Sequence, residues 1–153
     1  MNIGVMHMKK FGFTLDRIRS YKNQLLNKEK NALALLNAER LRIEEQILAL
    51  ERELEALDER EQRLMREGTT VNELKMLEYR KEAIRSEISQ AKVQLRVLDS
   101  SIDRQRRVVV GISQEISGLD KLEEHQLEEY NRLAAKEANQ ITEEFISFKI
   151  TTP

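Results

Sequence analysis

Histidines and paired carboxylates are the side chains of this sequence that could do acid–base or metal chemistry. The two histidines, His7 and His125, stand far apart, and neither belongs to an H-E-x-x-H pair, the spacing that places two imidazoles on one helix face for zinc. Adjacent carboxylates such as Glu44-Glu45 and Glu143-Glu144 would need a concave, water-excluding pocket to act in catalysis. The chain has no Cys, no glycine-rich phosphate loop and no G-x-S-x-G motif. We therefore expect no enzyme and no catalytic, metal or cofactor site.

Basic side chains gather in two places, where they could bind anions. Arg104, Arg106 and Arg107 form one cluster, but nucleic-acid binding needs a larger stripe of one sign, so we interpret them as a solvated helix face. The other group, Lys9-Lys10-Phe11-Gly12-Phe13, holds too few cations and aromatics for a membrane anchor. We expect Phe11 and Phe13 to cap the helix pair described below. The sequence thus predicts no nucleic-acid binding, and membrane contact only through protein partners.

The composition indicates which elements must position these residues. Charged residues make up 35% of the chain and aromatic residues 5%, the single Pro is the last residue, and Trp is absent. This composition is typical of a coiled coil. There is no apolar run of the roughly 18–20 residues that would span a bilayer, nor an apolar stretch of signal-peptide type, so we expect a cytoplasmic protein. Met8 is an alternative start to Met1.

Heptad repeats in both halves predict two helices that pack along an apolar seam, the a and d positions. In the second half, twelve of fourteen seam positions are apolar. These positions are Leu74, Leu77, Lys81, Ile84, Ile88, Ala91, Leu95, Leu98, Ile102, Gln105, Val109, Ile112, Ile116 and Leu119. In the first half they are Leu33, Leu36, Arg40, Ile43, Ile47, Leu50, Leu54, Leu57, Glu61 and Leu64. We interpret the polar members Arg40, Glu61, Lys81 and Gln105 as residues that fix the register.

The repeat changes at both outer ends of the two seams. Ile18 and Leu25 keep a spacing of seven, but Leu25 to Leu36 is eleven, which predicts a four-residue stutter. After Leu119 the apolar residues Tyr130 and Ile141 also follow at steps of eleven. These ends should therefore pack with locally altered supercoiling.

A stop signal and a start signal lie together between the two seams. Gly68 can end a helix in the left-handed conformation, and Thr70 with Glu73 forms a T-x-x-E capping box. A connection this short predicts an all-α fold, a long antiparallel two-helix coiled-coil hairpin. We expect a flexible basic N-terminus over 1–13, helices over about 14–66 and 71–148, a turn at 67–70 and a disordered tail over 149–153. The C-terminal helix would then extend about 20–25 residues beyond the start of the other.

That extension carries an apolar stripe at steps of three and four residues, and a surface of this kind is typical of a binding site. Its residues are Leu127, Tyr130, Ala134, Ala138, Ile141, Phe145 and Phe148. Two alternatives remain open, namely that residues 1–13 fold back over the stripe or that the helix frays there.

Several segments of the chain resemble the FliJ family, small coiled-coil proteins of the bacterial flagellar export apparatus. The opening Met8-Lys9-Lys10-Phe11-Gly12-Phe13-Thr14-Leu15-Asp16-Arg17-Ile18 is similar to the start of that family, with its basic pair and F-x-F alternation. Gly68-Thr69-Thr70-Val71-Asn72-Glu73-Leu74 resembles its turn, and two acidic segments, Leu122–Tyr130 and Glu143–Ile146, resemble its C-terminal helix. The resemblance covers about residues 8–148.

The resemblance implies a stalk-like protein of type III export that links the flagellar export ATPase ring to the cytoplasmic domain of the export gate and assists export chaperones. It places the chain in the cytoplasm, at the inner face of the membrane at the flagellar base, as a monomer or else a homodimer. The candidates it suggests on the ATPase side are Phe11, Phe13, Arg17, Leu127, Tyr130, Ile141 and Phe145, and those on the gate side are Leu48, Met65, Met76 and Tyr79. The alternatives are the equivalent stalk of a virulence-type secretion system and a generic dimeric coiled-coil scaffold.

Overall fold

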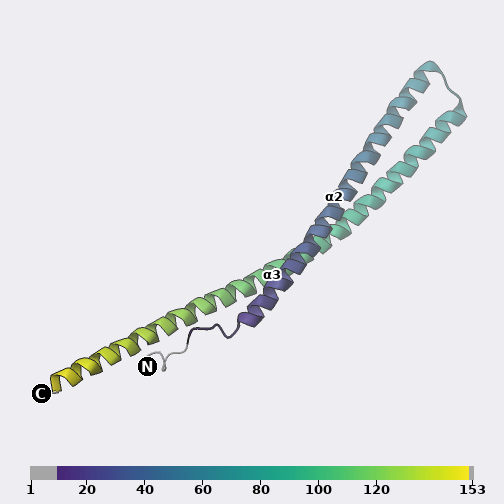
Figure 1. The fold of residues 1–153 in the computed structure, drawn as a ribbon. Helices are drawn as coiled ribbons and strands as arrows, with labels where there is room; N and C mark the ends of the chain where they lie inside the picture. Colours follow the sequence, from purple (N-terminus) through teal and green to yellow (C-terminus); the bar gives the residue numbers. More distant parts are fainter. Residues whose placement is uncertain (1–9, 152–153) are drawn as a thin grey trace. The chain divides into compact units, whose positions relative to one another are not determined.

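Two helices make up nearly all of the structure, a computed structural model that describes residues 10–151. Helix α2 spans Asp16–Glu67 and helix α3 spans Val71–Thr151, with no strand between residues 10 and 151 (Figure 1). The helices pair antiparallel, and α3 is the longer of the two. The structure therefore confirms the predicted all-α hairpin.

Helix α3 begins at the predicted residue, and the other three helix bounds differ from the prediction by one to three residues. Helix α2 begins at Asp16 rather than near Thr14, because the Asp16 N–H donates to the Phe13 carbonyl (3.2 Å) in a turn that precedes the helix. Helix α3 reaches Thr151, so residues 149–151 of the predicted disordered tail are helical. Residues 1–9, which include most of the predicted flexible N-terminus, and residues 152–153 lie outside the described part of the chain.

The turn at residues 68–70 is formed by the residue types that the sequence pattern indicates. Gly68 has a φ of 96°, in the left-handed region, and its N–H donates to the Leu64 carbonyl (2.9 Å). Thr70 Oγ1 accepts a hydrogen bond from the Glu73 N–H (3.2 Å), which is the first half of the predicted capping box. The Glu73 carboxylate accepts from the Thr69 hydroxyl. Both helix ends at the turn are therefore capped by local residues.

A Gly68→Ala variant is expected to lower the free energy of unfolding by about 1 kcal/mol, because an L-residue at this φ is strained. An added Cβ would meet nothing within 4 Å, so the loss would come from the backbone alone. The matched control is Gly118→Ala, where the φ is ordinary for a helix and the same change should stabilise by up to about 1 kcal/mol. Urea unfolding followed by circular dichroism measures both, and equal effects of the two substitutions would contradict the left-handed assignment.

The chain divides into two compact units. Unit 2 comprises Asn27–Val109, and unit 1 comprises the remainder, residues 1–26 and 110–153. In unit 2 the buried side chains all occupy predicted seam positions: Ile43, Ile47, Leu50, Leu77, Lys81, Ile84, Ile88, Ala91 and Ile102. Unit 1 has one buried side chain among its described residues, Ile112. The apolar core is therefore concentrated in unit 2.

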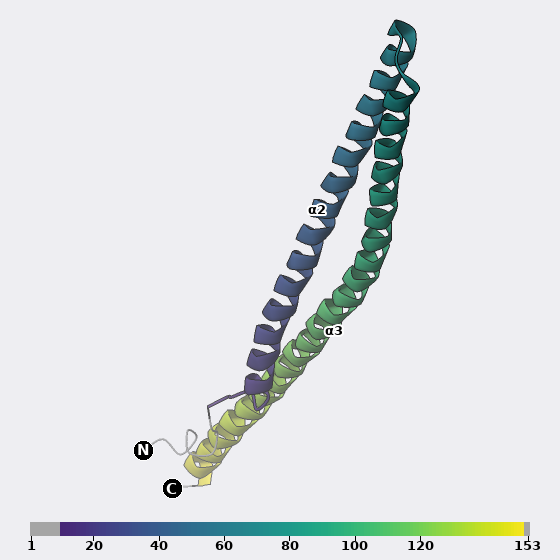
Figure 2. The ribbon, with the colours of Figure 1, turned by 90° about the vertical axis from the view of Figure 1, so that its right-hand side faces the viewer.

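Polar seam residues of unit 2 bind partners across the helix pair. Lys81 pairs with Glu61, another seam residue, and with Asp58 (2.9 Å). Arg40 Nε donates to the Asp99 carboxylate (2.6 Å). The Gln105 amide donates to the carbonyl (3.0 Å) and the carboxylate (2.6 Å) of Glu29. A shift of one helix would break all these contacts together, which supports the interpretation that the polar positions fix the register. Figure 2 shows the two helices of this unit side by side up to the turn.

The predicted stutter before Leu36 is wrong. Half-buried residues continue upstream of Leu36 in an unbroken three-four spacing, at Leu33, Glu29, Leu26, Lys22, Arg19 and Leu15. Ile18, which the prediction placed in the seam, is 47% exposed. After Leu119, Glu123, Gln126 and Tyr130 continue the heptads of α3, each of them half-buried, but the next half-buried residue is Ala134 rather than Leu133, so the spacing does change beyond Tyr130. The apolar pattern failed here because charged and amide side chains occupy the seam.

Candidate functional site

The open end of unit 1 comprises residues 10–26 and 110–150, and it contains most of the candidate residues. Phe11 packs on Tyr130 with ring centroids 5.6 Å apart and planes tilted by 54°. The guanidinium of Arg19 lies 5.1 Å from the centre of the Phe13 ring. The turn before α2 thus carries Phe11 onto α3, as the sequence predicts, whereas the ring of Phe13 lies against Arg19 of α2.

Arg19 joins the two helices of this end through carboxylates on both. It donates to Asp16 on its own helix (2.7 Å) and to Asp120 (3.2 Å) and Glu123 on α3. The hydrogen bond to Asp16, followed by the interactions with Glu123 and Asp120, raises the pKa of the Arg19 guanidinium above its usual range. One turn further on, Lys22 pairs with Glu115. The candidate Arg17 is exposed.

Helix α3 continues past Glu123, the residue opposite the first turn of α2, as far as Thr151 (Figures 1 and 2). We call residues 127–151 the overhang. Tyr130, Ala134 and Glu137 are half-buried at its root, whereas every residue from 138 to 150 is exposed. Ile141 is 43% and Phe145 57% exposed, and they lie one helical turn apart on one face. The overhang therefore presents apolar side chains at the spacing that a groove of another protein could accept.

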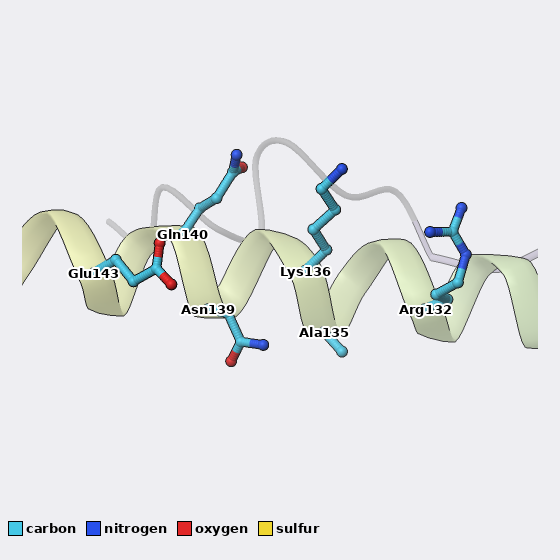
Figure 3. A pocket seen from close by; sticks show the side chains of 6 residues that line it. All are labelled: Arg132, Ala135, Lys136, Asn139, Gln140 and Glu143. Carbon is cyan, nitrogen blue, oxygen red and sulfur yellow. The ribbon is translucent and has the colours of Figure 1, made fainter.

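The hollow on the overhang is shallow and has walls from a single helix. Figure 3 shows its lining side chains leaving α3 in different directions rather than converging on one point. They are Arg132, Ala135, Lys136, Asn139, Gln140 and Glu143. Arg132 is paired with Glu129, whose pKa it lowers. Such a surface offers mixed charge to a partner, and within residues 10–151 no second element encloses it, as a small-substrate site would require.

The gate-side candidates lie in unit 2, and all four are exposed. Met76 and Tyr79 stand three residues apart on α3, and Tyr79 is 75% exposed. Leu48 and Met65 lie on α2, so the structure does not bring the four together into one face of one helix.

Sequence reasoning missed a longer feature around Met76 and Tyr79. Two of the outward heptad positions of α3, c and f, hold no charged residue from Met76 to Ser100, although 35% of the chain is charged. We call these residues the uncharged face: Met76, Tyr79, Ala83, Ser86, Gln90, Val93, Val97 and Ser100, all exposed. Near its end, Val93 and Val97 line a groove with Ile43 and Leu98. The sequence alone could have shown this face, because the outward positions of a coiled coil usually carry the most charged residues and these positions carry none.

Two further properties of the site follow from the described residues. Within residues 10–151, no group of three or more His, Asp or Glu side chains is arranged to hold a metal ion. In the same part of the chain, neither helix contains a segment that is apolar over a sufficient length to cross a bilayer.

Comparison with known proteins identifies the family. The sequence profile described as "Flagellar FliJ protein" matches residues 11–150, which is nearly the whole chain. No curated protein and no solved structure matched. The matched range contains the aromatic turn before α2, both helices of the hairpin and the overhang. The chain therefore belongs to the FliJ family and is a component of the flagellar protein export apparatus.

Proposed function

We propose that this protein acts as a non-enzymatic stalk that couples the flagellar export ATPase ring to the export gate and assists export chaperones. The observation that carries this proposal is the overhang, in which α3 continues beyond α2 with Ile141 and Phe145 exposed on one face. An isolated amphipathic helix of this kind suits insertion into a groove or ring built by other subunits. The open end would then bind the ATPase, with Phe11 and Tyr130 holding its root in place.

A second surface is available for the gate. The uncharged face of α3 includes Met76 and Tyr79 and belongs to unit 2, whereas the overhang belongs to unit 1. One chain could therefore engage two partners through different residues. We assign the cytoplasmic domain of the gate to the uncharged face, because exposed Met and Tyr side chains are typical of adaptable protein contacts. This assignment places the chain in the cytoplasm, at the inner face of the membrane at the flagellar base.

An Ile141→Ser/Phe145→Ser variant is expected to bind the export ATPase at least about tenfold more weakly, because each large apolar side chain contributes about 1.5–3 kcal/mol when buried by a partner. The matched control is Ile146→Ser/Ile150→Ser, which removes two exposed apolar side chains from the other side of the same helix. Binding to the immobilised ATPase is measured by surface plasmon resonance at fixed salt. If both variants bind like the unchanged chain, the overhang does not carry the contact.

A truncation tests the same surface without altering the hairpin. Ending the chain after Ala138 removes only exposed residues of the described overhang and leaves Phe11–Tyr130 and Arg19–Glu123 intact. Ending it after Leu119 would remove the partners of Arg19 and Phe11 as well, and so would disturb the open end itself.

The oligomeric state separates the stalk from a dimeric scaffold. We propose a monomer, because each helix already has its seam filled by the other within one chain. Sedimentation equilibrium should return the mass of one chain, 18.0 kDa, at micromolar concentration. Twice that mass would favour the scaffold.

A further inference from the structure

The two units fill their seams with different chemistry. In unit 2 the seam is mostly aliphatic, and Ile43, Ile47, Leu50, Ile84 and Ile88 belong to one buried cluster. In unit 1, two of the three seam residues that α2 contributes, Arg19 and Lys22 but not Leu26, are cations that face carboxylates on α3. Every side chain of these pairs remains partly accessible to water. Exposed ion pairs contribute little to stability and are weakened by salt.

The part of helix α3 that belongs to unit 1 also differs from the part in unit 2, because it contains two glycines. A Cβ at Gly111 or Gly118 would meet nothing within 4 Å, and neither residue has a positive φ. Neither close packing nor backbone geometry therefore requires glycine at these positions. The remaining effect of each glycine is to destabilise the helix, by about 1 kcal/mol relative to Ala.

We propose that residues 10–26 form a clasp that opens from α3 as one segment while unit 2 stays paired. The clasp is fixed by Phe11 on Tyr130 at its outer end and by the Arg19 and Lys22 ion pairs along its length. Opening it breaks few apolar contacts, because Ile112 is the one buried side chain among the described residues of unit 1. The proposal stands independently of which partner the overhang binds.

Hydrogen exchange of the full chain, read by mass spectrometry, tests the clasp directly. We expect amides of residues 16–26 to exchange at least about tenfold faster than those of residues 40–57, and to share one rate rather than a gradient from the end. Raising NaCl from 0.05 to 1 M should speed exchange in residues 16–26 and leave residues 40–57 unchanged, because the Debye length falls from more than 10 Å to about 3 Å. Equal rates in both segments, or a rate that ignores salt, would overturn the proposal.

Leucines in the seam should lock the clasp. Arg19→Leu/Lys22→Leu replaces the two cations by apolar side chains, and exchange of residues 16–26 should slow about tenfold and lose its salt dependence. The matched control, Arg17→Leu/Lys28→Leu, removes two exposed cations close by and should leave the rates as they are. If the control slows exchange as much as the seam variant does, general helix stabilisation explains the effect and the clasp is refuted.

Charge reversal supplies a second, independent readout. Lys22→Glu places a carboxylate opposite Glu115 and should speed exchange of residues 16–26. The double variant Lys22→Glu/Glu115→Lys restores an opposite-charge pair and should return the rate close to that of the unchanged chain. If the double variant stays as fast as the single one, the ion pair does not hold the clasp.

Discussion

An Ile84→Ala variant is expected to lose about 3 kcal/mol in the free energy of unfolding of unit 2. Ile84 is 0% exposed and is the one large side chain of the described residues that is completely enclosed. It belongs to the buried cluster in which Ile43, Ile47 and Leu50 of α2 meet Ile88 and Ala91 of α3. Two helices cannot collapse around a missing side chain without moving their axes. We therefore expect the variant to lose the free energy of burying the removed carbon atoms and also to contain a residual cavity.

Urea unfolding followed by circular dichroism at 222 nm measures this loss, with unit 2 expected to give the main transition. Val97→Ala is the control, because Val97 is 63% exposed on the same helix and its truncation should change the free energy by no more than about 0.5 kcal/mol. Similar losses for both variants would mean that the cluster around Ile84 is not the stabilising centre.

Lys81 is the site of the second large effect. Replacing it by Ala should lower the stability, whereas replacing it by Leu should preserve or raise it. It is the one buried charged side chain among the described residues, and Glu61, Asp58 and Glu78 surround its ammonium group. These carboxylates raise the pKa of Lys81 above its usual range, with Glu61 as the largest cause. Lys81→Ala removes the cation and the packing of its stem, and we expect a loss of about 2 kcal/mol.

Lys81→Leu should instead preserve or raise stability, because an apolar residue fits a seam position and removes the desolvation cost of the ammonium group. The same substitution should make the register of α2 against α3 less specific. Since the chain has no cysteine, a pair of introduced cysteines at exposed positions of α2 and α3 can carry spin labels, and the width of their distance distribution reports the register. A narrow distribution in Lys81→Leu equal to that of the unchanged chain would refute the register role of Lys81.

Much of the fold followed from local sequence patterns for identifiable physical reasons. The seam of unit 2 repeats every seven residues with few interruptions, and all its buried residues were in the predicted set. Gly68 and Thr70 marked the turn because each meets a specific backbone requirement there, a positive φ or an unpaired N–H. Patterns of this kind act over a few residues, so one sequence is sufficient to find them.

The open end could not be predicted in the same way. A search for apolar spacing selected Ile18 and missed Arg19 and Lys22, which are the residues that face α3. Their partners, Glu115, Asp120 and Glu123, lie about as far beyond the turn as the cations lie before it. Comparing charges at mirrored positions around Gly68 would have found these pairs. The binding partners are harder still to predict, because an exposed apolar stripe such as Ile141 and Phe145 does not show which protein would cover it.

The antiparallel turn also constrains how such a chain can change its length. The ion pairs that cross between the helices, from Lys81–Glu61 to Arg19–Asp120, join residues whose separations from Gly68 along the chain differ by no more than six. Losing one heptad from α2 alone would set every pair beyond the lost heptad seven positions out of step, whereas losing one from each helix would leave those pairs matched. We therefore expect viable insertions and deletions in the hairpin to occur in both helices together, seven residues in each. The C-terminal end of α3 can lengthen or shorten on its own.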